Sequence, residues 1–158
     1  MNTIQRIYTA IEEVLKIVVF IFLALMVVNI FGNVLLRYVF RYPIAWTEEL
    51  ARYLMIWLGF IGMSLALKYN EHVYISFVTK LFPKKVENIL IALSRILMLV
   101  FLVAVFIHSI KVIPVLSRQR STALQLPMYI PYLSVTVGSA LMILHVFYLF
   151  IFGSESKE

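Results

Sequence analysis

The chain has 158 residues, of which 63% are hydrophobic and only 14% are charged. Soluble domains average roughly 45–50% apolar and about 25% charged residues, so lipid is expected to surround most of this chain. The sequence contains no Cys and no Asp, which excludes thiolate metal sites and disfavours Mg²⁺-dependent phosphate chemistry. The net charge of +6 does not indicate nucleic-acid binding, because the basic residues lie at the ends of apolar runs.

Residues 1–15 carry apolar side chains at spacings of three and four, with polar side chains largely on the other side. This pattern predicts a short amphipathic helix that lies in the membrane interface before the first span. A cleaved signal peptide is the alternative interpretation. The apolar run that follows has about 20 residues, which exceeds the roughly 7–15 of a signal peptide, and no small-residue cleavage site stands out.

Four apolar segments follow, and each is long enough to cross about 30 Å of hydrocarbon as a helix. Their approximate bounds are 17–36, 45–67, 89–110 and 130–152. The sequence therefore predicts an all-α integral membrane protein with four transmembrane helices, organised as a single domain over residues 1–158.

Small and amide side chains at helical spacing in the first two spans predict faces on which helices pack closely. They are Asn29, Gly32 and Asn33 in the first span, and Gly59, Gly62 and Ser64 in the second. Thr47 is a candidate N-cap for the second helix, since threonine oxygens accept hydrogen bonds from free amides at helix starts.

An even number of spans places both termini on one side of the membrane, together with the connection 68–87. The connections 37–45 and 111–129 then lie on the other side. Lys and Arg are slightly more numerous on the side of the termini, where Lys80, Lys84 and Lys85 form a compact group. This bias favours cytoplasmic termini.

A charged stretch separates the first two spans. It contains Arg37, Arg41, Trp46, Glu48, Glu49 and Arg52. Glu48 and Glu49 precede Arg52 by four and three residues, so both pairs can meet on one helix face. The favoured interpretation is an interfacial ion network that anchors the second span, with Trp46 in the interface belt. The network alternatively fixes the hairpin of the first two spans or contacts a partner, whereas its position at the membrane edge argues against a proton relay.

Four further polar side chains lie within or beside the spans. Arg95 in the third span either reaches the headgroups or Glu71, or faces a neighbouring protein. His108 and His145 differ in depth by roughly 15–20 Å, so one metal cannot join them, and we expect each to be packed or hydrogen-bonded. His72 lies at the inner end of a span, where a histidine more often caps the helix than binds a metal. No catalytic or phosphate-binding motif is present, so we expect no enzyme activity, cofactor or metal.

Three stretches together resemble a known family. They are WTEELARYLMIWLGFIG at 46–62, LKYNEHVYIS at 67–76 and STALQLP at 121–127. In this order and spacing, the chain resembles the small membrane subunit of TRAP transporters, the DctQ family, over essentially its whole length. The family often has an Asp four residues after the His of the second stretch. Here that position is Ser76, so no role of that acid carries over.

The resemblance implies a heteromeric complex in the bacterial inner membrane. In this family, a large permease subunit carries the ion and substrate sites, and a periplasmic binding protein delivers the solute. An ion gradient, usually Na⁺, drives uptake, and the small subunit is a scaffold for an elevator-type permease. Residues 72–85 look most like members that import sialic acid; a C4-dicarboxylate is the other organic acid considered. Family topology places both termini in the cytoplasm.

The residues themselves agree with a scaffold, since the spans hold no central acid suited to binding Na⁺ and no broken helix. Basic residues on the periplasmic side would offer a docking surface for the binding protein. They are Arg37, Arg41, Arg118 and Arg120. A stand-alone four-span exporter is one alternative, although that class needs a membrane-embedded acid. A membrane enzyme is disfavoured by the missing Asp and Cys, and an assembly factor without a transport role stays open.

Overall fold

The computed structural model describes residues 3–42, 44–69 and 84–152. The helices are α1 (Thr3–Tyr38), α2 (Ala45–Tyr69), α4 (Lys84–Leu116) and α5 (Tyr129–Phe152). All four are long and apolar enough to cross a membrane, which confirms the predicted all-α fold class with four spans. The single-domain assignment over residues 1–158 stays a prediction.

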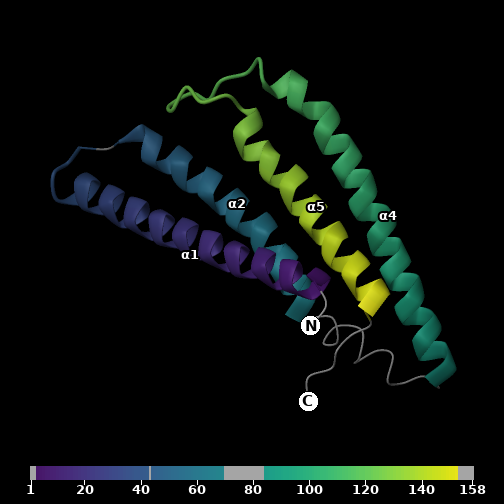
Figure 1. Ribbon diagram of the computed structural model, residues 1–158. Coiled ribbons are helices and arrows are strands. Elements are labelled where there is room, and N and C mark those ends of the chain that lie inside the picture. Colours follow the sequence, from purple (N-terminus) through teal and green to yellow (C-terminus); the bar gives the residue numbers. More distant parts are fainter. Residues whose placement is uncertain (1–2, 43, 70–83, 153–158) are drawn as a thin grey trace.

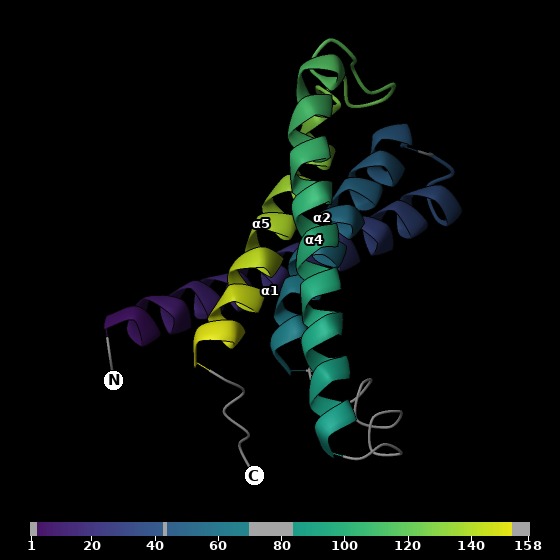
Figure 2. The ribbon, with the colours of Figure 1, turned by 90° about the vertical axis from the view of Figure 1, so that its right-hand side faces the viewer.

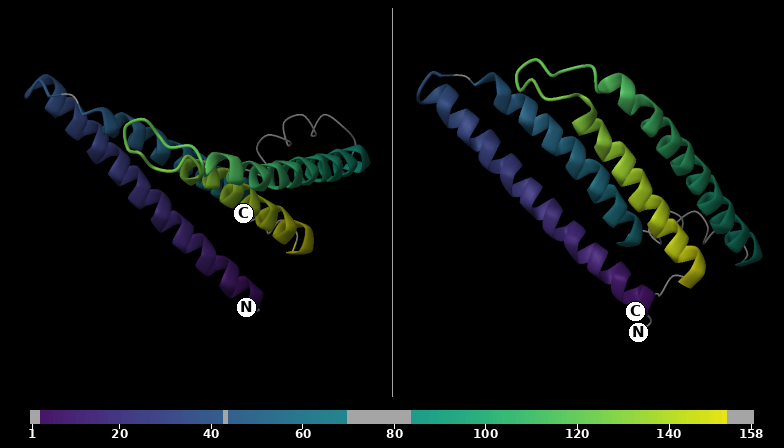
Figure 3. Two further views of the ribbon diagram at one scale, coloured as in Figure 1. Left: turned by 90° about the horizontal axis from the view of Figure 1, so that it is seen from above. Right: turned by 45° about the horizontal axis from the view of Figure 1, so that its top comes forward.

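The helices lie side by side in one row, in the order α1, α2, α5, α4 (Figures 1 and 3). The pairs that pack along their length are α1 with α2, α2 with α5, and α5 with α4. The last helix of the chain therefore lies between the second and the third. A row buries less of each helix than a closed bundle does, because the end helices have one neighbour each and the middle helices have two.

Helix α1 begins at Thr3 and continues to Tyr38 without a break, so residues 3–15 are its first turns and do not form a separate interfacial helix. No Gly or Pro interrupts the sequence before Gly32, which explains the continuity. A helix of 36 residues is about 54 Å long, which exceeds the hydrocarbon thickness and favours a tilted helix. Figure 2 shows α1 inclined relative to α4, the helix at the other end of the row.

The buried apolar core is small. It consists of Leu102 from α4 with Met142 and Val146 from α5, and Phe60 and Leu67 of α2 pack against it. Most other large apolar side chains are exposed. This is the expected pattern in lipid, where apolar side chains gain little from leaving the acyl chains and helices associate through close packing and hydrogen bonds.

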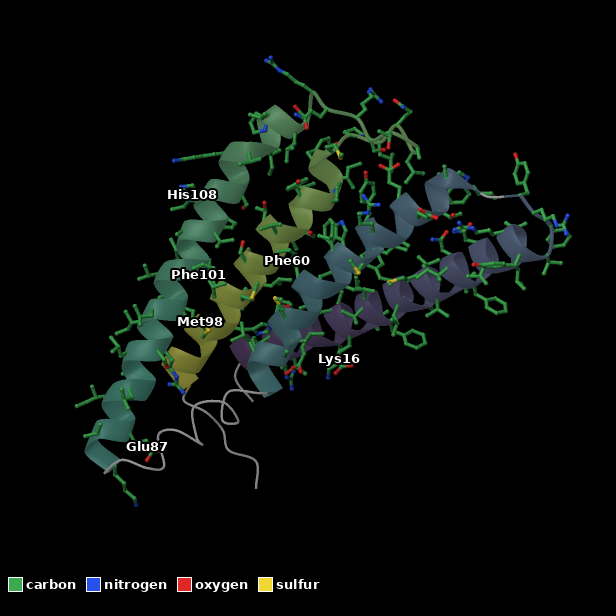
Figure 4. All side chains as sticks on the ribbon, turned by 180° about the vertical axis from the view of Figure 1, so that it is seen from behind. Lys16, Phe60, Glu87, Met98, Phe101 and His108 are labelled. Carbon is green, nitrogen blue, oxygen red and sulfur yellow. The ribbon has the colours of Figure 1, made fainter. Side chains whose placement is uncertain are left out.

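Helices α2 and α5 approach each other closely at Gly138. A Cβ atom at this position would lie 2.6 Å from Cβ of Phe60 and 3.2 Å from its backbone carbonyl carbon. Figure 4 shows Phe60 on the side of α2 that faces α5. Ser64 and Ser134 are fully buried, and each hydroxyl donates to the carbonyl oxygen three residues earlier in its own helix. Small residues thus allow the two helices to meet.

The predicted packing faces are only partly correct. Ser64 is buried as expected, but a Cβ atom at Gly59, Gly62 or Gly32 would meet no other atom within 4 Å. These three glycines therefore do not mediate close packing between the described helices. Lipid-facing and helix-facing residues are equally apolar, so spacing alone could not identify the face that is used.

Candidate interaction site at the hairpin end

Two connections lie at the same end of the row, which we call the hairpin end (Figure 1). They are the α1–α2 connection, residues 39–44, and the α4–α5 connection, residues 117–128. The start of α2 lies beside the second connection and contacts it through polar groups. Most of the site residues predicted from the sequence lie here.

Glu49 is the centre of this polar contact. Its side chain is buried, and its Oε2 atom accepts hydrogen bonds from the backbone N–H groups of Ala123 and Leu124, both at 2.9 Å. The hydroxyl of Tyr53, one turn further along α2, donates to Oε1. Two consecutive amides that point at one carboxylate form a small anion-binding nest. Hydrogen bonds to an ionised acceptor are among the stronger ones in proteins, so Glu49 fixes the connection 117–128 on α2.

The connection closes into a compact turn through its own hydrogen bonds. Ser121 donates its N–H to the carbonyl of Leu126 at 2.8 Å, and its hydroxyl accepts the N–H of Leu126 at 3.1 Å. Met128 donates its N–H to the carbonyl of Gln119 at 2.9 Å. The stretch STALQLP, residues 121–127, is therefore a turn whose middle backbone amides bind Glu49. It is one of the three stretches that carry the family resemblance.

One residue of this turn has an unusual backbone conformation. Gln125 has a φ angle of 54°, in the left-handed region that non-glycine residues seldom adopt. The guanidinium of Arg120 donates to the carbonyl of Gln125 at 3.1 Å, and the Gln125 side chain donates to the carbonyl of Thr122 at 3.2 Å. These bonds stabilise the turn from its exposed side, while Glu49 holds it from the buried side.

Exposed basic residues surround the turn, as the sequence predicted. Arg118 and Arg120 lie on the turn itself, and Arg41 lies on the α1–α2 connection. Arg41 also has a positive φ angle, 54°. The negative charge of Glu49 is directed inward onto backbone amides, so it does not offset the exposed arginines of this end, which stand among exposed apolar and aromatic side chains.

The hairpin of α1 and α2 is joined by two polar contacts. Arg37 lies 3.7 Å from Glu48, so one ion pair of the charged stretch joins α1 to α2, although both side chains are more than half exposed. Such exposed pairs contribute about 0–1 kcal/mol. Asn29 donates its side-chain amide to the carbonyl of Thr47 at 2.7 Å, so one residue of its predicted packing face does contact α2.

The predicted pairing of both glutamates with Arg52 is wrong. Glu48 pairs with Arg37, Glu49 binds the 117–128 turn, and Arg52 makes no hydrogen bond or ion pair with another described residue. The reason is that consecutive residues point about 100° apart around a helix, so Glu49 faces α5 while its neighbour faces away. Thr47 is not the N-cap either: α2 begins at Ala45, and the Thr47 hydroxyl donates to the carbonyl of Ile44 at 2.6 Å.

A second polar contact lies towards the opposite end of the row and was not predicted. The hydroxyl of Tyr8 is 2.7 Å from Nδ1 of His145, with the two rings edge to face. Both side chains are buried, and they join α1 to α5, which are not neighbours in the row. His145 is thus a hydrogen-bonded membrane histidine, as expected. Its partner Tyr8 is 137 residues away in the sequence, so residue spacing could not predict this contact.

Glu12 lies one helical turn beyond Tyr8 and is also buried, with 3% of its surface exposed. The predicted amphipathic pattern placed it on a solvated side, which is wrong. Its carboxylate lies 3.5 Å from the ammonium of Lys16, which also pairs with Glu13 at 3.0 Å. Among the described side chains of α1, the buried ones are Tyr8 and Glu12 near its start, whereas its apolar length is largely uncovered.

The remaining predicted site residues are not brought together. His108 lies on α4 and its Nδ1 is 2.8 Å from the carbonyl of Ala104 in the same helix (Figure 4). Arg95 is half-buried in α4, Trp46 is exposed at the start of α2, and His72 lies outside the described residues. No group of three potential metal ligands occurs in the part of the chain that the structure describes.

The described residues include four helices long and apolar enough to span a membrane, which defines this protein as a multi-pass membrane protein. The chain belongs to the family described as tripartite ATP-independent periplasmic transporters, DctQ component, whose model matches residues 26–153. This confirms the resemblance seen in the sequence and places the protein among inner-membrane transporter components.

Named relatives support the same family. The chain is 40% identical over 90 residues to a putative TRAP transporter small permease protein of Haemophilus influenzae, covering 57% of this chain and 56% of the relative. It is 31% identical over 126 residues to the sialic acid TRAP transporter small permease protein SiaQ of Vibrio cholerae, covering 80% and 68%. It is 38% identical over 85 residues to the sialic acid TRAP transporter permease protein SiaT of H. influenzae, where it covers 51% of this chain but spans only 14% of the relative.

Proposed function

We propose that this chain is the small membrane subunit of a TRAP transporter and the fixed scaffold of a large elevator-type permease subunit. The complex takes up an organic acid, sialic acid or a C4-dicarboxylate, delivered by a periplasmic binding protein and driven by an ion gradient, with Na⁺ as the coupling ion. Both termini lie in the cytoplasm, so the hairpin end faces the periplasm. The chain itself has no enzymatic role.

The observation that carries this proposal, together with the family membership, is the open row of helices. Only 6% of the most apolar window of α1, and the same share of α4, is buried within the chain. A single row of helices, joined by polar contacts at Glu49 near one end and between Tyr8 and His145 near the other, offers a broad surface that can support a larger membrane protein.

We assign one face of α2 to the contact with the permease. Exposed residues recur along it at spacings of three and four. They are Arg52, Met55, Gly59, Met63 and Ala66. Arg52 has no hydrogen-bond or ion-pair partner among the described residues, and an arginine within a span is costly unless it is paired or reaches the headgroups. The open space beside Gly59 leaves room for another helix to approach. A permease helix that packs beside Gly59 and carries a hydrogen-bond acceptor for the Arg52 guanidinium accounts for both the open space and the arginine that is unpaired among the described residues.

Arg52→Leu is expected to weaken the complex, because the permease acceptor would lose its charged partner. We expect the amount of permease that co-purifies with the tagged subunit to fall about tenfold, which corresponds to a loss of about 1.4 kcal/mol of binding free energy. The measurement is quantitative co-purification in mild detergent. Arg41→Leu is the matched control, since Arg41 is equally an exposed arginine but lies on the connection beyond the helices. Equal recovery for both variants would refute the assignment of this face.

The hairpin end is assigned to the binding protein. Its exposed arginines, Arg41, Arg118 and Arg120, form a basic surface, while Glu48 is paired and Glu49 is directed inward. A soluble protein with an acidic surface is therefore attracted and oriented by this end. Complementary charge acts chiefly on the rate of association and on its salt dependence.

A further inference from the structure

We propose that Glu49 is a positioning residue for docking: its carboxylate holds the 117–128 connection so that Arg118 and Arg120 meet the soluble partner in one fixed arrangement. This inference rests on the proposed function, in which the hairpin end receives the binding protein. It adds that a buried acid on a transmembrane helix, which contacts neither solute nor partner, sets how fast the partner docks.

The first step is the attachment itself. The amides of Ala123 and Leu124 lie at the middle of the turn, and both reach the same oxygen of Glu49 at 2.9 Å. Tyr53 donates to the other oxygen, so the carboxylate is held from α2 and from the turn at once. Glu49 is 74 residues away from Ala123 in the chain, so this contact fixes the turn relative to a different helix hairpin.

The second step concerns what the turn presents. Arg120 and Pro127 pair across the turn in an isolated β-bridge, and the Arg120 guanidinium binds the carbonyl of Gln125 at 3.1 Å. These local bonds define the shape of the turn but do not position it on the helices. Glu49 supplies most of that position, and the Tyr53 hydroxyl adds a weaker contact, 3.6 Å from Sδ of Met128. A surface whose charged groups are already arranged loses less conformational entropy on binding than a mobile one does.

The third step is the charge. A carboxylate exposed beside Arg118 and Arg120 would oppose the attraction of an acidic partner. Glu49 is 9% exposed and its charge is met by two amides and a hydroxyl, so it stabilises the turn without appearing on the docking surface. Glu48, the adjacent acid, lies 65% exposed and plays no part in this arrangement. The two neighbouring glutamates therefore have separable roles.

The test uses the complete complex of this chain with a TRAP permease subunit, and the periplasmic binding protein that delivers solute to that complex. Glu49→Ala is expected to speed hydrogen exchange in residues 117–128 at least tenfold while the helices exchange normally, because the amides lose their acceptor. The association rate constant of the binding protein is expected to fall about tenfold. Sodium acetate should slow the exchange and restore part of the rate, compared with sodium chloride of equal ionic strength, because acetate supplies the missing carboxylate.

Two further variants make the outcomes distinct. Glu48→Ala should leave both readouts within about twofold of the unchanged protein, since an exposed pair is weak. In Glu49→Ala, normal exchange in 117–128 would overturn the attachment, and faster exchange with an unchanged association rate would overturn the positioning role. Arg118→Glu combined with Arg120→Glu tests docking itself. If that pair leaves the association rate unchanged at every ionic strength, the docking surface is wrong, while the exchange data still judge whether Glu49 holds the turn.

Discussion

Gly138→Ala is expected to lower the thermal stability of the purified protein by about 1–3 kcal/mol, which corresponds to a fall of about 5 °C in Tm. The added methyl group would lie 2.6 Å from Cβ of Phe60 and 3.2 Å from its carbonyl carbon. Cβ is fixed to the backbone and the carbonyl carbon is part of it, so side-chain rotation cannot relieve this clash and α2 must move away from α5. Because the small core lies along this contact, the change disturbs the middle of the row.

Gly59→Ala is the matched control for this experiment. Gly59 lies in α2, one residue before Phe60, but a Cβ atom there meets nothing within 4 Å. Alanine is also the better helix former by about 1 kcal/mol, so this variant should melt at or above the temperature of the unchanged protein. Similar losses in the two variants, measured by thermal unfolding in one detergent, would refute the close approach of α2 and α5 at Gly138.

Loss of the hydrogen bond between Tyr8 and His145 is expected to release the start of α1 from α5. Hydrogen bonds between membrane helices average about 0.6 kcal/mol and reach about 1.7 kcal/mol. We expect the upper part of that range, since both side chains are at least 95% buried and lie 2.7 Å apart. A double-mutant cycle of Tyr8→Phe and His145→Leu, followed by reversible unfolding in detergent, measures the coupling energy directly.

His108→Leu is the control for this cycle, because His108 is exposed and contacts the backbone of its own helix. Combined with Tyr8→Phe, it should give additive effects within about 0.3–0.5 kcal/mol, as for distant sites. Coupling of Tyr8 with His108 as strong as with His145, or no coupling with His145, would contradict the contact between α1 and α5.

The sequence was sufficient to predict the four spans, since each apolar run is long enough to cross a bilayer and the connecting segments are polar. It also identified the two stretches that meet in the site, around Glu49 and at residues 121–127, each through its resemblance to the family. It did not predict that these stretches contact one another. Glu49 was paired with Arg52 on local spacing, but its partners are amides 74 and 75 residues away.

The order in which the helices pack could not be predicted from the sequence, and the reason is physical. In water, the apolar face of a helix identifies its buried side, whereas in lipid both faces are apolar. The glycines at 59 and 62 therefore looked like packing positions, although Gly138 makes the close contact. The amphipathic pattern also failed at the start of α1, because Glu12, which it assigns to the polar side, is buried beside Tyr8 of the apolar side.

Reconstituted uptake tests the scaffold account most directly. Proteoliposomes would contain the permease with or without this chain, or this chain alone, and receive the solute-loaded binding protein under an inward Na⁺ gradient. We predict uptake of the organic acid only when the chain, the permease and the binding protein are all present, and none from the chain alone. Uptake by this chain without the permease, or undiminished uptake by the permease without this chain, would contradict the account.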